Sequence, residues 1–206
     1  MELATATIQQ FITELGSRTT TPGGGAAAAL SAAQSAALAR MVVVFSKGKK
    51  AFTEHEQVHA EMEAHLLGLA DDSIQAGQED AKAWGRLSDV LAMRPDDPAR
   101  AAALEPAVMD SIAAPRRIQE ISIAILEHCE YLLDCSSKHL KSDLAIAADL
   151  ASVAARSAAW NVNVNTPLLQ DREQAQRQQD ASVDTCQQAS GINDRIRNRL
   201  LQEQEQ

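Results

Sequence analysis

Aromatic side chains are scarce in this chain: Phe, Trp and Tyr together make up 3% of its 206 residues. The apolar fraction is nevertheless 45%, so alanine supplies much of it. Alanine is the strongest helix former and a poor strand former, and no stretch alternates polar with apolar residues as a strand would. We therefore expect an all-α fold, a single-domain bundle of about six helices.

Cysteine is also scarce, with three residues and no Cys-x-x-Cys pair. An odd, small number excludes a disulfide framework and fits a reducing compartment, so the expected localisation is cytoplasmic. The first ten residues lack the basic segment and apolar core of a secretory signal. The apolar segment 26–45 contains Gln34 and Arg40, which favours a buried core helix over a membrane span.

Positive charge is in deficit, because 19 Lys and Arg face 28 Asp and Glu for a formal net charge of −9. Nonspecific binding of nucleic acid or of an anionic membrane surface needs clustered cations, so both are disfavoured. The partner we expect is a small molecule. Lys47, Lys49 and Lys50 form one small basic cluster, which is either a solvated helix end or a place for a carboxylate-bearing ligand.

Hydrophobic periodicity and the residues that interrupt it divide the chain into helices. Thr53 has the type of an N-cap, with Glu56 as its capping-box partner. Pro106 and Pro115 lie inside an otherwise helical pattern, so a break or kink is expected near each. Residues 93–98 form a loop rich in proline and aspartate. The expected helices cover residues 5–15, 26–45, 53–91, 99–135, 143–165 and 172–206.

His55-Glu56-Gln57-Val58-His59 matches the His-Glu-x-x-His motif of zinc proteases, and His65 falls where a third ligand would lie. We reject this reading because Met62 replaces the glycine that would turn the chain. On a continuous helix His59 and His65 would project about 240° apart. No metal is therefore expected. A zinc hydrolase using His55, Glu56 and His59 remains a remote alternative, and the Glu-x-x-His of di-iron bundles is weaker still, since no second copy exists.

Three consecutive glycines, Gly23, Gly24 and Gly25, follow Pro22 immediately before an apolar helix. Glycine allows close backbone approach, and the helix N-terminus presents free N–H groups at the positive end of its dipole. The pattern indicates either an anion site or a sharp turn against a neighbouring helix. It is not a phosphate-binding loop, because no Gly-Lys-Ser/Thr comes after it.

Five further polar residues are candidates for chemistry. Asn161 and Asn165 share a helix face, where their amides either bind the backbone or hydrogen-bond a polar heterocycle. Asp80 is either a surface charge or a proton carrier. Ser142-Asp143 opens an apolar helix, so helix capping is its simplest interpretation.

The glycine segment and several motifs C-terminal to it resemble one enzyme family. Thr21-Pro22-Gly23-Gly24-Gly25 precedes an alanine-rich helix, Met41-Val42 and Gly48-Lys49-Lys50, and Asp80-Ala81-Lys82-Ala83-Trp84 resembles an Asp-x-x-Ala-aromatic element. The chain is thus similar to formimidoyltetrahydrofolate cyclodeaminases and the stand-alone methenyltetrahydrofolate cyclohydrolases over about residues 3 to 165, with a helical tail over 171–206. The residues that match the family's C-terminal signature are Ser142-Asp143, Ala147-Ala148, Arg156, Asn161-Val162 and Asn165.

The resemblance implies a homodimeric folate one-carbon enzyme that acts on the N5/N10 bridge of tetrahydrofolate, either as an ammonia-releasing cyclodeaminase or as a cyclohydrolase. No cofactor beyond the tetrahydrofolate substrate is implied. Asp143 or Asp80 would be the acid or base, with Ser142 beside it. Asn161 and Asn165 would hold the pterin. The segment Pro22, Gly23, Gly24 and Gly25, together with Lys49, would meet the glutamate carboxylates.

The chain also departs from the family's pattern. The family has a Gly-Asn pair before Ser-Asp, where this chain has Ser136-Ser137, and a glycine two residues after the aspartate, where this chain has Ala145. These departures keep a second interpretation open, in which the chain is a divergent, non-catalytic helical module that binds folate or a protein.

Overall fold

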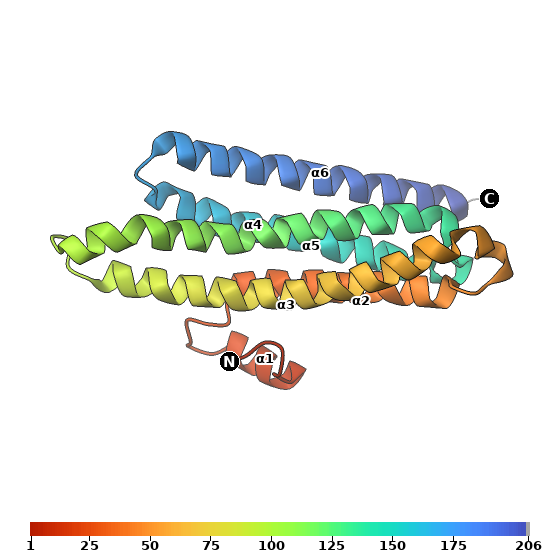
Figure 1. The fold of residues 1–206 in the computed structure, drawn as a ribbon, viewed down its shortest axis with the longest axis horizontal. Helices are drawn as coiled ribbons and strands as arrows, with labels where there is room; N and C mark the ends of the chain where they lie inside the picture. Colours follow the sequence, from red (N-terminus) through yellow and green to blue (C-terminus); the bar gives the residue numbers. More distant parts are fainter. Residues whose placement is uncertain (205–206) are drawn as a thin grey trace.

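The computed structural model describes residues 1–204 of the chain. That part is helical and contains no strand, so the all-α prediction is confirmed (Figure 1). Three short 3-10 helices join the longer elements: η1 (Lys50–His55), η2 (Lys138–Leu140) and η3 (Thr166–Leu168). The α-helices are α1 (Ile8–Leu15), α2 (Gly24–Ser46), α3 (Glu56–Ala92), α4 (Pro98–Cys135), α5 (Lys141–Asn165) and α6 (Arg172–Gln204).

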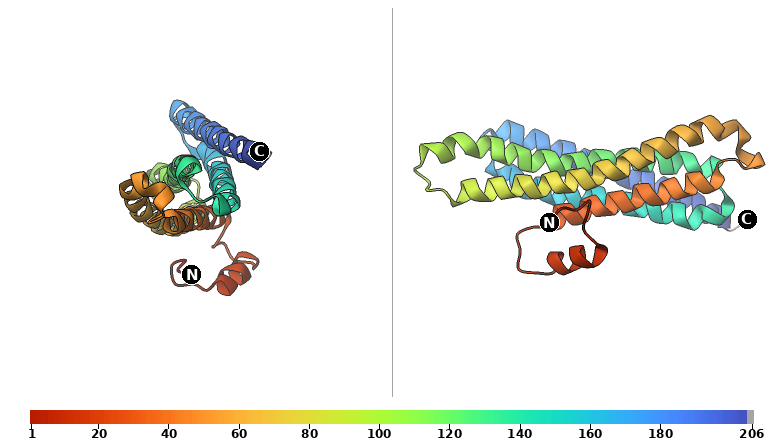
Figure 2. Two further views of the ribbon diagram at one scale, coloured as in Figure 1. Left: turned by 90° about the vertical axis from the view of Figure 1, so that its right-hand side faces the viewer. Right: turned by 60° about the horizontal axis from the view of Figure 1, so that its bottom comes forward.

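Helices α2 to α5 form an antiparallel bundle, and α6 lies along α4 and α5 on its outer side (Figures 1 and 2). The main core joins small side chains of α2 and α5 to larger ones of α3 and α4, such as Leu66 and Ile125. A second cluster, around Leu87, Val108 and Val162, packs the end of the bundle where α3 and α5 finish.

Helix α2 is the one helix in the described chain whose length and composition would allow it to cross a membrane. On one face Ala29, Ala32 and Ala36 are fully buried in the bundle, as expected for a core helix. Small residues let the helices approach closely: a Cβ added to Gly77 of α3 would lie 2.7 Å from the Cβ of Ala29. Near its C-terminal end α2 exposes Val44 and Phe45.

Of the break or kink expected at the two prolines of the fourth helix, the break does not occur, because α4 runs through both Pro106 and Pro115. A proline removes the N–H that would bond the carbonyl four residues earlier. For Pro115 that carbonyl belongs to Ser111, and the side-chain amide of Asn165 donates to it over 2.9 Å. The replacement bond satisfies the freed acceptor, so the helix continues.

Thr53 is not the N-cap of α3, contrary to the prediction. It lies inside η1, where its hydroxyl donates to the carbonyl of Lys50 over 3.1 Å. Helix α3 begins at Glu56, with His55 at the cap position. The Glu56 carboxylate instead accepts from the N–H of Gly48 over 3.0 Å.

Helix α1 stands away from the bundle and is joined to α2 by a loop (Figure 2). Thr7 and Gln10 form the capping box that begins it. Helical spacing predicts one apolar face of Ile8, Phe11, Ile12 and Leu15. Only Phe11 of these is buried, in a small cluster with Ala26 and Leu3. Ile8 is 84% exposed and Ile12 57% exposed, so these two apolar side chains stay outside that cluster.

Candidate active site

A cavity of about 390 Å³ opens where α2 begins, between the loop before α2 and helices α3, α4 and α5. It gathers Asp80, Asn161 and Asn165 together with the three glycines that the sequence singled out. Its lining residues are Thr20, Thr21, Gly23, Gly24, Gly25, Asp80, Ala81, Trp84, Leu91, Ser111, Asn161, Val164, Asn165 and Leu168. Pro22 is buried just before the glycines and is not among the residues that line it.

The carboxyl group of Asp80 lies directly on the backbone of Gly25. A Cβ added to Gly25 would come within 2.0 Å of the Asp80 Oδ2 atom, so only glycine leaves room for this carboxyl group. Burial raises the pKa of Asp80 from its ordinary value of 3.8 to about 6. Asp80 is the one ionisable residue among those lining the cavity, and a group with this pKa can exchange protons near neutral pH.

The N-terminus of α2 adds hydrogen-bond donors beside Asp80. Its N-cap, Gly23, has no side chain to cap the helix, and the first backbone bond at this end runs from the N–H of Ala27 to the carbonyl of Gly23, over 3.1 Å. The N–H groups of Gly24 and Gly25 therefore have no hydrogen-bond partner in the described chain. They face the cavity at the positive end of the helix dipole.

The two asparagines of α5 that line the cavity differ in their hydrogen bonds. The Asn165 amide is 7% exposed and donates to the Ser111 carbonyl. The Asn161 Nδ2 and the Ser111 Oγ are buried and have no hydrogen-bond partner in the described chain. Buried polar atoms are almost always paired, so these two atoms are free to bond water or a polar ligand inside the cavity.

An apolar wall completes the cavity. The indole of Trp84 lies one turn after Asp80 on α3 and is 40% exposed, and Leu91, Val164 and Leu168 continue the apolar lining. A flat aromatic surface next to unpaired donors and acceptors fits a planar heterocycle with polar edges. Sequence reasoning missed Ser111, whose only signal was its position four residues before Pro115.

Lys49, Ser142 and Asp143 lie at the opposite end of the bundle from this cavity. Asp143 and Asn161 are separated by about five turns of α5, or roughly 27 Å. Leu140 occupies the N-cap position of α5, so Ser142 and Asp143 do not cap the helix as the simplest interpretation had it. Within one chain the structure therefore does not bring these three residues to Asp80.

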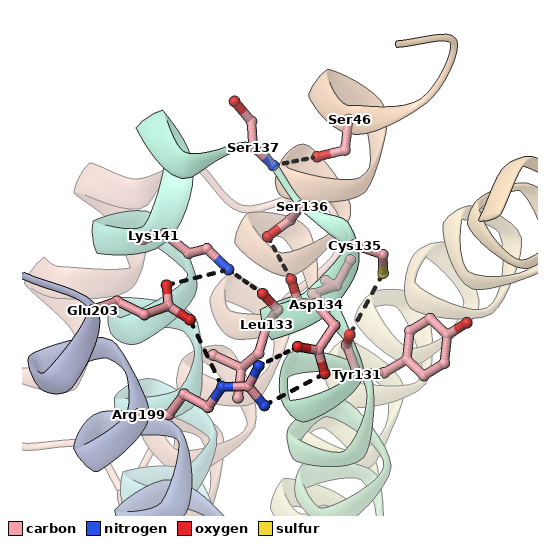
Figure 3. A network of polar contacts seen from close by, with 11 residues as sticks. Ser46, Tyr131, Leu133, Asp134, Cys135, Ser136, Ser137, Lys141, Arg199 and Glu203 are labelled. Atoms are coloured by element: carbon pink, nitrogen blue, oxygen red, sulfur yellow. Dashed lines mark hydrogen bonds and ion pairs between the residues drawn. The ribbon is translucent and has the colours of Figure 1, made fainter. Parts of the chain in front are cut away.

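The turn before Ser142 is held by a polar network, which Figure 3 shows. Lys141 Nζ donates to the Leu133 carbonyl and lies 3.9 Å from the Glu203 carboxylate of α6. Arg199 of α6 pairs with both Asp134 and Glu203. This network fixes the start of α5 against α4 and α6.

Ser136 and Ser137, which stand where the family has Gly-Asn, have structural partners in this turn (Figure 3). The hydroxyl of Ser136 donates to the Leu132 carbonyl. The N–H of Ser137 donates to the hydroxyl of Ser46, at the end of α2, over 3.1 Å. Both residues therefore tie the α4–α5 connection to its neighbours.

The histidines of the His-Glu-x-x-His sequence have separate partners. His55 lies in η1, with its Nδ1 3.3 Å from the Tyr131 hydroxyl. His59 is buried in α3, with its Nε2 2.9 Å from the Cys135 carbonyl. His65 Nδ1 is 2.7 Å from His128 Nε2. Among residues 1–204, no three His, Cys, Asp or Glu side chains are grouped so that they could hold a metal ion.

Comparison with known proteins finds one family model and a solved structure that match this chain. A family model described as formiminotransferase-cyclodeaminase matches residues 7–183. The crystal structure of formiminotetrahydrofolate cyclodeaminase from Thermotoga maritima superposes with a TM-score of 0.90, covering 97% of this chain and 98% of that one at 21% sequence identity. At that identity the likeness establishes the fold. A search of curated proteins found no match.

Proposed function

This chain belongs to the formiminotransferase-cyclodeaminase family, and from that premise we propose that it is a folate one-carbon enzyme. Its reaction would be that of a formimidoyltetrahydrofolate cyclodeaminase, which closes the N5/N10 bridge of tetrahydrofolate and releases ammonia. The observation that carries this proposal is the Asp80 carboxyl, with its pKa near 6, in a cavity that also contains an indole and unpaired polar groups.

The chemistry needs one well-placed proton carrier. N10 attacks the formimino carbon on N5, so a C–N10 bond forms, and the bond from that carbon to the departing nitrogen breaks. The formimino nitrogen enters protonated, as =NH2+, so the proton that N10 loses is the one that this nitrogen gains as it leaves as ammonia. A carboxylate with a pKa near the working pH can accept the first proton and return it to the leaving group. We assign this role to Asp80.

The rest of the cavity would bind and orient the folate. Trp84 offers an apolar face for the pterin ring, while Asn161 Nδ2 and Ser111 Oγ would pair with its polar edge. Asn165 would contribute through its fixed amide. Gly25 touches Asp80, so the free N–H groups of α2 would bond folate atoms at the reacting centre. They would not bond the glutamate carboxylates of the folate, which are distant from that centre. By holding N10 close to the formimino carbon on N5, the cavity would supply the proximity that the cyclisation needs.

Three further features belong to the same proposal. The enzyme would work on its tetrahydrofolate substrate without a cofactor, since proton transfer and positioning suffice for the cyclisation. It would act in the cytoplasm, in keeping with a chain of three unpaired cysteines. It would be a homodimer, which is supported by the exposed apolar side chains of α1 and of the end of α2.

The near-ultraviolet absorbance of the methenyl bridge tests the proposed reaction. Purified protein is mixed with 5-formiminotetrahydrofolate, and separately with 5,10-methenyltetrahydrofolate, each against a protein-free control. We expect absorbance to rise in the first mixture faster than in its control. A fall in the second mixture alone would make the protein a cyclohydrolase. No change in either, with folate bound, would replace the enzyme by a folate-binding module.

A further inference from the structure

The side-chain amide of Asn161 has its two ends in different surroundings. Its oxygen, Oδ1, lies 3.8 Å from the position of a Cβ built on Gly24, so the oxygen is beside the N-terminus of α2. The free N–H groups and the positive dipole end of the helix favour an acceptor at this place. The Nδ2 atom, which can only donate, is left buried without a hydrogen-bond partner in residues 1–204.

Ser111 differs from other serines that are buried in helices of this chain. Ser46, Ser73 and Ser122 each donate from the hydroxyl to the carbonyl four residues earlier, which is a common way for a helical serine to satisfy its hydroxyl. The Ser111 Oγ atom is buried, lines the cavity and has no partner in the described chain. Its hydroxyl can therefore either donate to a ligand or accept from one.

Close approaches between neighbouring residues place the Asn161 amide beside the proposed reacting centre. Asn161 Oδ1 lies next to Gly24. The following residue, Gly25, touches the Asp80 carboxyl with its backbone. Since Asp80 is assigned the proton transfer at the N5/N10 bridge, the folate atom within reach of Asn161 is one close to N5. In the pterin ring that atom is the oxygen on C4, because C4 and N5 are bonded to the same ring carbon.

We propose that Asn161 selects a pteridine ring that carries an oxygen, and not an amino group, on C4. Asn161 Nδ2 donates to that oxygen, and the Ser111 hydroxyl accepts from the adjacent ring N–H. A 4-amino pteridine presents a donor on C4 and an acceptor at the adjacent ring nitrogen. The Ser111 hydroxyl can turn to donate to that acceptor, whereas Asn161 Nδ2 meets another donor. This inference deepens the proposed function and rests on it.

The strength of this selection depends on the burial of the donor. Asn161 Nδ2 is buried, so water cannot replace the missing acceptor when a 4-amino ring lies against it. A buried polar group that loses its partner carries the full cost of its desolvation. The 4-amino compound should therefore bind about 10- to 100-fold more weakly than its 4-oxo counterpart.

Calorimetric titration with tetrahydrofolate and with 4-amino-4-deoxytetrahydrofolate tests the selection without relying on turnover. The wild type should prefer tetrahydrofolate by about 10- to 100-fold. Asn161→Asp keeps the shape of the side chain but turns the donor into an acceptor, so it should bind the 4-amino compound more tightly than tetrahydrofolate. Ser111→Ala should weaken the binding of both ligands by similar factors, because the serine hydroxyl suits either ring.

Asn163→Asp is the matched control for the change of charge. Asn163 is exposed on α5 and is not among the residues that line the cavity, so this variant should keep the wild-type preference. Equal affinities of the wild type for the two ligands, or an unchanged preference in Asn161→Asp, would overturn the selection by Asn161. A preference for tetrahydrofolate without turnover of 5-formiminotetrahydrofolate would contradict the proposed reaction alone. Binding of neither ligand would overturn both.

Discussion

Asn161 and Asn165 are the same residue type on the same face of α5, yet their surroundings give them different tasks. Asn165 replaces the hydrogen bond that Pro115 removes from the Ser111 carbonyl. The Nδ2 of Asn161 is buried and has no partner in residues 1–204. Helical spacing predicts that both amides reach one place. It could not separate them, because the distinction depends on a proline in another helix.

Alanine substitutions should separate the two amides. Asn165→Ala leaves a buried carbonyl without a donor, so we expect the free energy of unfolding to fall by about 1–3 kcal/mol. Asn161→Ala breaks no bond within the chain and should change it by less than about 0.5 kcal/mol, while weakening folate binding about tenfold. Urea denaturation and calorimetric titration with a folate analogue would measure both effects. Equal losses of stability would contradict the distinction.

Asp80 should leave a signature in the pH dependence of stability. Its pKa in the folded chain, about 6, exceeds that of an unfolded Asp, about 3.9. The folded state therefore holds the proton more tightly, and stability is lost as the pH rises from about 4 to 6. Asp80→Asn removes this cost, so relative to wild type it should gain about 1–3 kcal/mol between pH 4 and pH 8. Denaturation curves at both values measure it, and a pH-independent difference would refute the shifted pKa.

At the scale of single elements, the sequence predicted where the helices lie well. It predicted poorly which residue caps α3 and how α4 continues past its prolines. Apolar periodicity and loop residues placed most helix ends within a few residues, because these signals are local. The continuation of α4 through Pro115 depends on Asn165, and the start of α3 depends on η1 using Thr53. The bond from Asn165 to Ser111 joins two distant parts of the chain, so it leaves no local signal in the sequence.

The glycine loop illustrates the same limit and gives a matched pair of variants. The sequence left an anion site and a sharp turn against a neighbouring helix open, and the structure shows a close approach to the neighbouring helix α3 at one glycine. An added Cβ at Gly25 would overlap the Asp80 carboxyl at 2.0 Å, whereas at Gly24 the nearest atom, Asn161 Oδ1, is 3.8 Å away. The two positions belong to the same helical turn.

Alanine at these positions should have opposite effects on stability. Gly24→Ala should fold with equal or slightly greater stability, by up to about 1 kcal/mol, because alanine loses less backbone entropy in a helix. Gly25→Ala must displace Asp80 or the start of α2 and should be destabilised by roughly 1–3 kcal/mol. Thermal unfolding of both variants measures the difference. If Gly25→Ala were as stable as Gly24→Ala, Asp80 would not lie on this backbone.

At the scale of the whole molecule, composition was sufficient to predict an all-α bundle, since few aromatics and much alanine leave helix packing as the way to bury apolar surface. The division of the candidate residues between two ends could not be predicted in this way. The order of residues in the sequence does not show that Asp80 and Asn161 line one cavity. Nor does it show that Asp143 lies at the other end of the bundle, roughly 27 Å from Asn161 along α5. That information is in the antiparallel arrangement of α2, α3 and α5.

The central claim is that Asp80 transfers the proton during bridge closure, and the pH profile of kcat/KM for 5-formiminotetrahydrofolate tests it most directly. For the wild type we predict a fall below about pH 6, as the Asp80 carboxylate becomes protonated. Asp80→Asn should be slower by about 10²–10⁴-fold, without that inflection. An Asp80→Asn variant with the wild-type rate and the same profile would contradict the claim and move the proton transfer to another group.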